Sequence, residues 1–218
     1  MPGAWEVLSN PSMVLGVLHV DTTTVAWAMG LRALQLTGPV IPVAGMPYDM
    51  ARNSVVMRAL EMGASFCAFL DSDVIPPPDA FLRLMRHNLP MVSGVYFRRS
   101  PPHGAPVAIK NGTWLNPLPR NQLVEVDLVG AGCLCLRTDF LRSIPPHRKG
   151  HHWFDWCVNL RGTGVVPEDE CLSEDFTFNV HARKHGVKTF LDTSIICKHV
   201  GYAEAGHGTL LPLETPAA

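Results

Sequence analysis

Short apolar runs alternate with segments of helical length between residues 12 and 90. The runs are rich in β-branched residues and lack regular polar alternation, which is typical of strands buried on both faces of a sheet. The segments between them mostly end at Gly or Pro, as helices do. We therefore predict strands at 12–20, 39–45 and 65–70, and helices at 23–37, 49–63 and 76–88, with Asp49 as the cap of the second helix.

This spacing is that of βαβ units, and it predicts an α/β fold with a mainly parallel, Rossmann-like sheet and helices on both faces. A chain of 218 residues, 47% hydrophobic and 17% charged, is long enough and apolar enough for one domain with a full core. Ligands of such sheets bind beyond the carboxyl ends of the strands. Three features lie there and should converge on one crevice: Asp21 and Thr22, the first helical turn that carries Arg52, and the pair Asp71 and Asp73.

The second half of the chain is less regular. We predict a strand at 90–97, a long loop at 100–121, two strands flanking a glycine turn and then a short helix within 124–144, and a strand or strand pair at 187–201. Residues 145–172 have no clear period and are long enough for a functional loop. Residues 173–186 alternate partly like a strand, but Ser173 is a good helix cap and Gly186 a good helix end, so we predict a helix.

Several classes of protein are disfavoured by the composition. No stretch reaches the roughly 18 apolar residues of a membrane span, and the N-terminus lacks the pattern of a signal peptide, so we expect a cytoplasmic protein without membrane contacts. The six cysteines show no CxxC spacing, and we expect buried free thiols rather than zinc ligands or disulfides.

Positive charge is concentrated in the middle of the chain. Residues 83–149 contain ten Lys and Arg and three Asp and Glu, a net charge of +7, whereas the rest of the chain carries −8. This distribution suits a polyanionic ligand, and an ordinary solvated surface is the alternative.

The sequence "LDSD" (70–73) ends the third predicted strand with two carboxylates. Such a pair suits Mg²⁺ or Mn²⁺, which proteins often bind through one or two carboxylates plus substrate phosphates. A second interpretation is a haloacid-dehalogenase-like phosphatase, whose DxDx(T/V) signature is matched by "DSDV" with Asp71 as nucleophile and Asp73 as its acid partner. That signature normally follows the first strand, and here two strand–helix units precede it. A third interpretation is a polar loop start without chemistry.

Five short motifs in a fixed order resemble the GT-A glycosyltransferases that use nucleotide sugars, especially the family 2-like group: "ARN" (51–53), "LDSD" (70–73), "GAG" (130–132), "SED" (173–175) and "KHVG" (198–201). The resemblance covers roughly residues 12–202. It implies one glycosyltransferase domain over 1–218, with a nucleotide-sugar and metal half at 12–100, an acceptor and catalytic half at 101–202, and a tail at 203–218.

On the donor side, the resemblance assigns Asp71, Ser72 and Asp73 to the DxD motif that binds a divalent metal, Mn²⁺ or Mg²⁺, and the donor's diphosphate and ribose. His199 matches the late histidine that often completes the metal shell.

Other polar residues near this edge complete the expected donor site. Arg52 could pair with the diphosphate or form a surface salt bridge. Asp21 and Thr22 lie where this fold usually holds the base and ribose.

On the catalytic side, Asp175 matches the general base of inverting enzymes, with Glu174 as the second candidate; acids that offset a helix dipole are the alternative. Gly130 and Gly132 match a glycine loop near the reacting sugar, where a missing side chain lets backbone amides approach a ligand.

Two tryptophans precede the "SED" motif. Trp153 and Trp156 could stack on a sugar or a nucleobase, or fill the core beneath a loop.

The resemblance implies a metal-dependent, inverting glycosyltransferase with a nucleotide-diphosphate sugar, a UDP-sugar being favoured, as donor. The acceptor stays open, and the basic middle segment permits a modified base in phage DNA. The alternatives are the phosphatase with Asp71 as nucleophile and a non-catalytic module that binds nucleotide sugars. A sugar-phosphate nucleotidyltransferase is disfavoured because "HVDTTTVAWAMG" (19–30) contains no glycine-rich basic loop.

Overall fold

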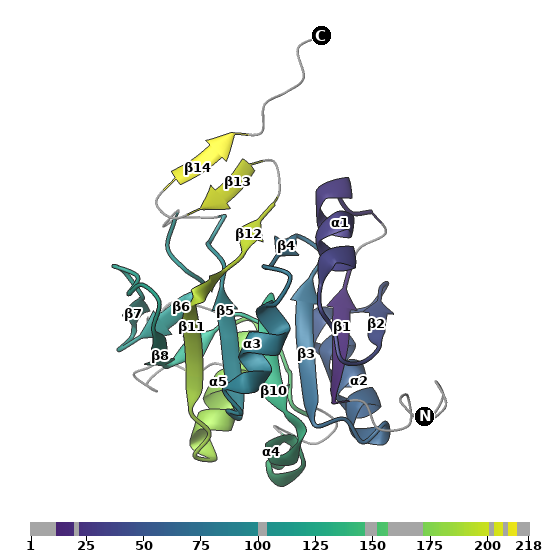
Figure 1. The fold of residues 1–218 in the computed structure, drawn as a ribbon. Helices are drawn as coiled ribbons and strands as arrows, with labels where there is room; N and C mark the ends of the chain where they lie inside the picture. The colour runs from purple at the N-terminus through teal and green to yellow at the C-terminus, as the bar shows by residue number, and fades with distance from the viewer. Residues whose placement is uncertain are drawn as a thin grey trace.

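A computed structural model describes residues 12–19, 22–99, 104–146, 152–156 and 172–200, and the backbone of two further strands at 203–206 and 209–212. Its central sheet has seven strands in the order β2-β1-β3-β10-β5-β11-β8 (Figure 1). Their bounds are β2 (Val40–Val43), β1 (Met13–Leu18), β3 (Phe66–Asp71), β10 (Cys133–Arg137), β5 (Met91–Val95), β11 (Thr189–Ile196) and β8 (Leu123–Val126).

The direction of the strands confirms the predicted sheet. β2, β1 and β3 run parallel, and so do β5 and β11. β10 is antiparallel to both of its neighbours, and β8 is antiparallel to β11. Five of these seven strands therefore point the same way, which makes the sheet mainly parallel, as the βαβ spacing predicted.

Helices cover both faces of the sheet, as expected. Successive side chains of a strand point to opposite faces, so that Val14 packs on one side and Met13 on the other. The Val14 side carries α2 (Tyr48–Glu61), α4 (Thr138–Ser143) and α5 (Glu174–Lys184), and the Met13 side carries α1 (Val25–Ala33) and α3 (Ala80–Arg86).

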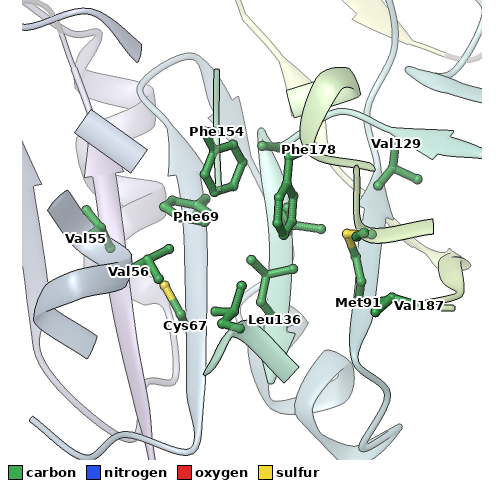
Figure 2. Packing of buried hydrophobic residues seen from close by; sticks show 14 of the residues in the cluster. Val55, Val56, Cys67, Phe69, Met91, Val129, Leu136, Phe154, Phe178 and Val187 are labelled. Carbon is green, nitrogen blue, oxygen red and sulfur yellow. The ribbon is translucent and has the colours of Figure 1, made fainter. Parts of the chain in front are cut away.

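Three aromatic side chains connect the sheet, α5 and the segment 152–156 (Figure 2). Phe154 stacks on Phe178 of α5 with 4.4 Å between ring centroids, and it meets Phe69 of β3 edge-on at 5.4 Å. All three are fully buried. Burial of each such ring contributes about 2–3 kcal/mol, so this cluster holds the start of α5 against the middle of the sheet.

Two small sheets lie next to the central one. One has the order β14-β13-β12-β4, with β4 (Val74–Ile75), β12 (Lys198–His199), β13 (Ala203–Gly206) and β14 (Thr209–Pro212). The other has the order β7-β6-β9, with β6 (Ala108–Lys110), β7 (Thr113–Trp114) and β9 (Leu128–Val129). One expectation was therefore wrong: the long loop at 100–121 contains a hairpin, because backbone pairing formed where side-chain periodicity gave no signal. The tail at 203–218 contains two paired strands.

The ends of the helices required smaller corrections. α1 ends at Ala33, earlier than predicted, and Pro47 rather than Asp49 occupies the N-cap of α2. Asp49 lies inside the first turn of α2, and within the described residues its Oδ1 atom is buried without a hydrogen-bond partner. None of the helices in the described ranges has the length and apolar composition that crossing a membrane requires.

The cysteines agree with the expectation of free thiols as far as they are described. Four of them are buried and unbridged: Cys67, Cys133, Cys135 and Cys197. Cys157 and Cys171 lie outside the described residues.

Candidate active site

A pocket of about 840 Å³ lies at the carboxyl end of β3, where the sheet was expected to bind its ligand. Eight predicted site residues line it: Arg52, Asp71, Ser72, Asp73, Trp156, Glu174, Asp175 and His199. These side chains come from α2, the β3 end, the 152–156 segment, α5 and β12, so the fold gathers into one pocket residues that are far apart in the sequence.

The backbone of the carboxylate motif is held by the start of α1. Trp27 donates its indole N–H to the carbonyl of Asp71 at 2.9 Å. Thr23 donates its hydroxyl to the carbonyl of Ser72 at 3.0 Å. Because these carbonyls are fixed, the carboxylates that follow β3 have a defined position at the pocket wall.

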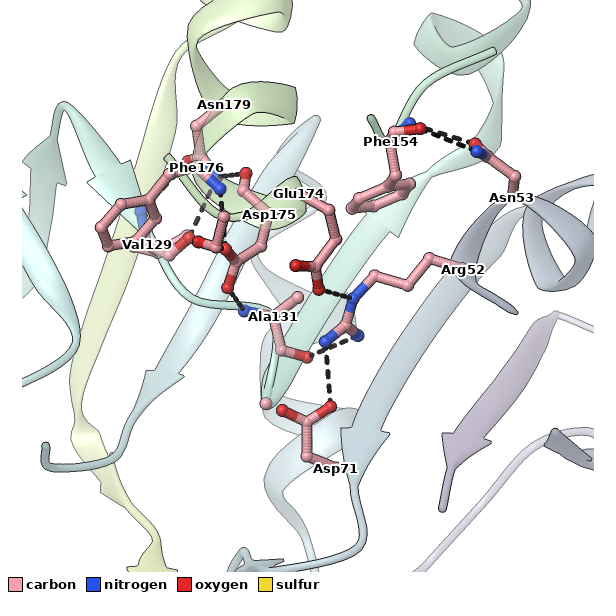
Figure 3. A network of polar contacts seen from close by, with 12 residues as sticks. Arg52, Asn53, Asp71, Val129, Ala131, Phe154, Glu174, Asp175, Phe176 and Asn179 are labelled. Carbon is pink, nitrogen blue, oxygen red and sulfur yellow. Dashed lines mark hydrogen bonds and ion pairs between the residues drawn. The ribbon is translucent and has the colours of Figure 1, made fainter. Parts of the chain in front are cut away.

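Arg52 is a buried link between the two acidic motifs (Figure 3). Its Nη2 donates to Asp71 Oδ1 at 3.0 Å and its Nε donates to Glu174 Oε1 at 2.9 Å, while Nη1 lies 3.5 Å from the carbonyl of Ala131. Burial alone would lower the pKa of Arg52, but the two carboxylates raise it above its ordinary value. Arg52 therefore stays charged. It forms salt bridges, but they are buried and not on the surface as the sequence interpretation had it.

Burial also changes the proton affinity of the two carboxyls that Arg52 contacts. Burial raises the pKa of Asp71, and the nearby Arg52 opposes this shift. Burial, and after it the neighbouring Asp175, raise the pKa of Glu174 to about 7, again against the effect of Arg52. A carboxyl that titrates near neutral pH is typical of functional sites, although structural ion-pair networks produce the same shift.

The carboxylate of Asp175 is oriented by three hydrogen bonds. Its Oδ1 accepts from the hydroxyl of Ser173 and from the N–H of Phe176, and its Oδ2 accepts from the N–H of Ala131 at 3.1 Å. A carboxylate can accept about four hydrogen bonds, so in the described structure one lone-pair position on Oδ2 stays available. Ser173 occupies the N-cap of α5 as predicted, but its hydroxyl orients Asp175 instead of capping the helix.

Asn179 fixes α5 against the strand that leads into the glycine turn. Its side-chain amide exchanges hydrogen bonds with both the N–H and the carbonyl of Val129, at 3.1 and 3.0 Å. It also donates to the carbonyl of Asp175 at 2.7 Å. The glycine turn and the candidate base are thus held in one rigid unit.

The two predicted glycines leave room for a tyrosine. A Cβ atom on Gly130 would lie 1.9 Å from Tyr96 Oη, and one on Gly132 would lie 2.8 Å from Tyr96 Cζ. Gly132 donates its N–H to Tyr96 Oη at 3.1 Å. Neither glycine lines the pocket, whereas Tyr96 does. The missing side chains therefore let Tyr96, which lines the pocket, approach the turn.

Asp73 and His199 meet because β4 pairs with β12. His199 Nε2 lies 3.5 Å from Asp73 Oδ1, and Nδ1 lies 2.6 Å from the carbonyl of Phe97. A carbonyl can only accept, so Nδ1 carries the proton and Nε2 is the nitrogen that faces Asp73. Burial works to raise the pKa of Asp73, but the contacts with His199 and Arg99 lower it overall.

The side chains that could ligate a divalent cation fit such an ion only in part. Asp73 and His199 lie together at the pocket wall, whereas Asp71 Oδ1 is occupied by Arg52. Within the described ranges, no three His, Cys, Asp or Glu side chains are grouped as a complete metal site. One carboxylate and one imidazole are nonetheless a sufficient protein contribution for Mg²⁺ or Mn²⁺ when substrate phosphates supply further oxygens.

The two tryptophans have different surroundings. Trp156 lines the pocket and is 39% exposed. Trp153 lies outside the pocket lining, donates its indole N–H to the carbonyl of Leu141 at 2.8 Å and packs against the core. Of the residues expected to hold the base and ribose, Thr22 is exposed and not part of the lining, and Asp21 lies outside the described residues.

Sequence reasoning missed an aromatic part of the pocket. Trp114 of β7 and Phe176 of α5 line it with 6.1 Å between their ring centroids, and the guanidinium of Arg98 stacks on Trp114 at 3.9 Å. The sequence offered one signal, which is that Phe176 directly follows the candidate base Asp175. Trp114 lies in a segment rich in Pro and Gly that gave no signal for a site.

The arginines of the basic middle segment whose positions are described do not all lie at the pocket. Arg98 and Arg99 line the pocket. Arg137 pairs with Phe66, at the opposite end of β3 from Asp71. At least these three positive charges are therefore divided between the two ends of β3 and do not form one patch.

Comparisons with known proteins address the fold. No family profile matches the chain, and no curated protein is detectably similar to it in sequence. The solved structure of A197 from STIV superposes with a TM-score of 0.67 and 16% identity, covering 94% of this chain and 96% of that one. GalNAc-T7, solved with UDP, GalNAc and Mn²⁺, superposes with a TM-score of 0.50 and 9% identity, covering 88% of this chain and 44% of that one. The chain has the GT-A fold. The fold implied by the motif order is thereby confirmed, and at these identities the likeness extends to the fold alone.

Proposed function

We propose that this chain is a glycosyltransferase that moves a sugar from a nucleotide-diphosphate sugar to an acceptor hydroxyl, with inversion at the anomeric carbon. The observation that carries the proposal is that Asp73, His199 and Asp175 line one pocket of about 840 Å³ in a GT-A fold. A pocket of this volume is in the range of small-molecule sites. GalNAc-T7 was crystallised with UDP and Mn²⁺, which supports a UDP-sugar and a divalent cation as the first ligands to test.

The donor diphosphate is expected beside the "DSD" motif. Asp73 and His199 would hold a divalent cation, whose chemistry is to neutralise charge on the departing diphosphate. Asp71 completes the acidic motif, and Arg52 fixes its carboxylate. Ser72 and Arg99 also line this part of the pocket and supply donors to phosphate oxygens.

Asp175 is the proposed general base. Its half-buried carboxylate lines the pocket, and Oδ2 keeps a lone pair that can accept the acceptor's proton. As the proton passes to Asp175, the acceptor oxygen bonds to the anomeric carbon and the bond from that carbon to the diphosphate breaks, which releases the nucleoside diphosphate. Ser173 and Ala131 hold the base in position through the hydrogen bonds to its two oxygens.

Glu174 is assigned a positioning role in this proposal, although its raised pKa suits a base. Its side chain is 5% exposed and one oxygen accepts from Arg52 at 2.9 Å. A carboxylate that is buried and ion-paired has less access to an acceptor than Asp175 has.

The aromatic side chains form the proposed acceptor wall. Trp114, Trp156 and Phe176 line the pocket, and Phe176 directly follows the base. Aromatic rings bind flat apolar faces, so a sugar ring is the acceptor that this wall suits. A flipped, modified DNA base could stack there as well, and it belongs in the acceptor panel.

A calorimetric titration with nucleoside diphosphates tests the donor site. We expect UDP or GDP to bind tightly only with Mn²⁺, and Asp73→Asn to weaken this binding by at least about tenfold because a charged ligand of the cation is lost. Asp139→Asn is the matched control, since this exposed carboxylate pairs with Arg137 at the far end of the sheet. Equal nucleotide binding with and without the cation in the wild type and in Asp139→Asn would refute the metal-dependent site. Labelling of Asp71 by a phosphoester substrate would instead support the phosphatase alternative, and binding without any turnover would support the binding module.

A further inference from the structure

Arg99 forms an ion pair with one of the proposed metal ligands. Its Nη2 atom lies 2.8 Å from Asp73 Oδ2, and its Nη1 donates to the carbonyl of Val200 at 3.1 Å. Val200 in turn donates its N–H to the carbonyl of Asp73 at 2.7 Å. The guanidinium therefore bridges the two short strands that bring Asp73 and His199 together.

The two arginines of the acidic motif differ in exposure. The side chain of Arg52 is 3% exposed and has acceptors on three sides, so it is a permanent partner of Asp71. The side chains of Arg99 and Asp73 are 45% and 32% exposed. Exposed ion pairs are weak and exchange readily with other cations. Asp71 thus has a fixed counter-ion, whereas Asp73 has an exchangeable one.

A cation at Asp73 and His199 would compete with this guanidinium. The two oxygens of Asp73 are divided between Arg99 on Oδ2 and His199 near Oδ1. A divalent cation bound by the same carboxylate would be repelled by a guanidinium at hydrogen-bond distance, and the repulsion is stronger in a pocket than in bulk water. Cation binding therefore favours release of Arg99 from Oδ2.

We propose that Arg99 is an exchangeable counter-ion: it neutralises Asp73 before the donor binds, and it transfers to the donor diphosphate when a divalent cation takes its place. This inference rests on the proposed donor site. Arg99 already lines the pocket, and a planar guanidinium binds phosphate oxygens through two parallel hydrogen bonds. One residue therefore prevents tight binding of the cation alone and favours binding of the cation together with the diphosphate.

The proposal predicts effects of opposite sign for one substitution. In Arg99→Gln, the affinity for Mn²⁺ alone should rise about two- to fivefold, since a competing exposed ion pair is removed. In the same variant, the affinity for UDP at saturating Mn²⁺ should fall about tenfold, since a charged contact with the diphosphate is lost. If Arg99 had a purely structural role, its replacement would not raise the affinity for Mn²⁺ and lower the affinity for UDP.

The experiment measures free Mn²⁺ by electron paramagnetic resonance in titrations without nucleotide, and UDP binding by calorimetry in excess Mn²⁺. Arg98→Gln is the matched control, because Arg98 lines the same pocket but stacks on Trp114. Its effect on Mn²⁺ affinity should be less than half that of Arg99→Gln. Thermal melting of each variant confirms that it is folded.

Each result has one interpretation. Mn²⁺ affinity that is unchanged or lower in Arg99→Gln overturns the counter-ion role, and unchanged UDP affinity overturns transfer to the diphosphate. Asp73→Asn separates these failures from failure of the proposed function. If Asp73→Asn binds Mn²⁺ as the wild type does, the metal site itself is wrong.

Discussion

Arg52 and Glu174, 122 residues apart in the sequence, form a hydrogen bond of 2.9 Å between Nε and Oε1 in the interior of the protein. The same guanidinium binds Asp71 at 3.0 Å, so one side chain joins the strand end that carries the acidic motif to the helix that carries the candidate base. The relative position of the proposed donor site and the proposed base thus depends on a buried charge.

Replacement of Arg52 should destabilise the fold strongly. In Arg52→Gln, the buried Glu174 and the half-buried Asp71 lose their cationic partner, and we expect the free energy of unfolding to fall by about 3–5 kcal/mol. Urea denaturation measures this change. Arg58→Gln on the same helix is the control, with an expected change below about 1 kcal/mol, because Arg58 and Glu61 form an exposed pair. Equal losses in the two variants would contradict the role assigned to Arg52.

The contact between Gly130 and Tyr96 can be tested by a double-mutant cycle. Gly130→Ala places a methyl group where Tyr96 Oη lies, and overpacking of this kind typically lowers stability by about 1–3 kcal/mol. Tyr96→Phe removes that oxygen, so the double variant should lose less than the sum of the single variants. Additive losses in urea denaturation would show that the turn relaxes without involving Tyr96.

The raised pKa of Glu174 predicts a specific pH dependence of stability. The folded-state pKa of about 7 lies above the ordinary value of 4.5, so between these values the folded state binds more protons than the unfolded state. Stability should therefore fall as pH rises through this window, by up to about 3 kcal/mol from this group. Glu174→Gln cannot titrate there, and its free energy of unfolding between pH 5 and pH 8 should have a flatter slope than that of the wild type. Parallel slopes would show that Glu174 ionises near its ordinary pKa.

The fold was predictable because its signals are local. Each strand of the first half is a short apolar run, and each helix has its own length and end signals, so the sheet class followed from elements predicted one at a time. Pairing between very short strands gives no such signal. β4 and β12 have two residues each. Only the structure shows that these strands pair, and this pairing brings His199 to Asp73.

Which residues gather at the candidate site was largely predictable, but their contacts were not. The motif order selected most of the polar lining, including Asp71 and Asp175. Burial is a property of the whole fold, which is why Arg52 was interpreted as a diphosphate ligand or a surface salt bridge and not as the buried link that the structure shows. Trp114 was missed because it lies on a two-residue strand, and Trp153 was expected in the site because sequence alone does not separate a core tryptophan from a pocket one.

The tryptophans provide a test of the acceptor wall. Trp114→Ala and Trp156→Ala should raise the KM for a carbohydrate acceptor by about tenfold, since stacking on an aromatic ring contributes about 1 kcal/mol or more, and should leave UDP affinity within about twofold. Trp153→Phe should leave this KM unchanged and reduce stability by about 1 kcal/mol through the lost bond to Leu141. A KM effect confined to Trp153 would place the acceptor elsewhere.

The central claim is that Asp175 accepts the acceptor's proton in a pocket that binds a nucleotide sugar. The most direct measurement is kcat for release of UDP from a panel of UDP-sugars, with carbohydrate and modified-DNA acceptors, for the wild type and Asp175→Asn. We predict turnover by the wild type in the presence of Mn²⁺ and a kcat about 10²–10⁴ lower in the variant, with UDP affinity unchanged within about twofold. Turnover by Asp175→Asn at the wild-type rate would contradict the role of Asp175 as the base.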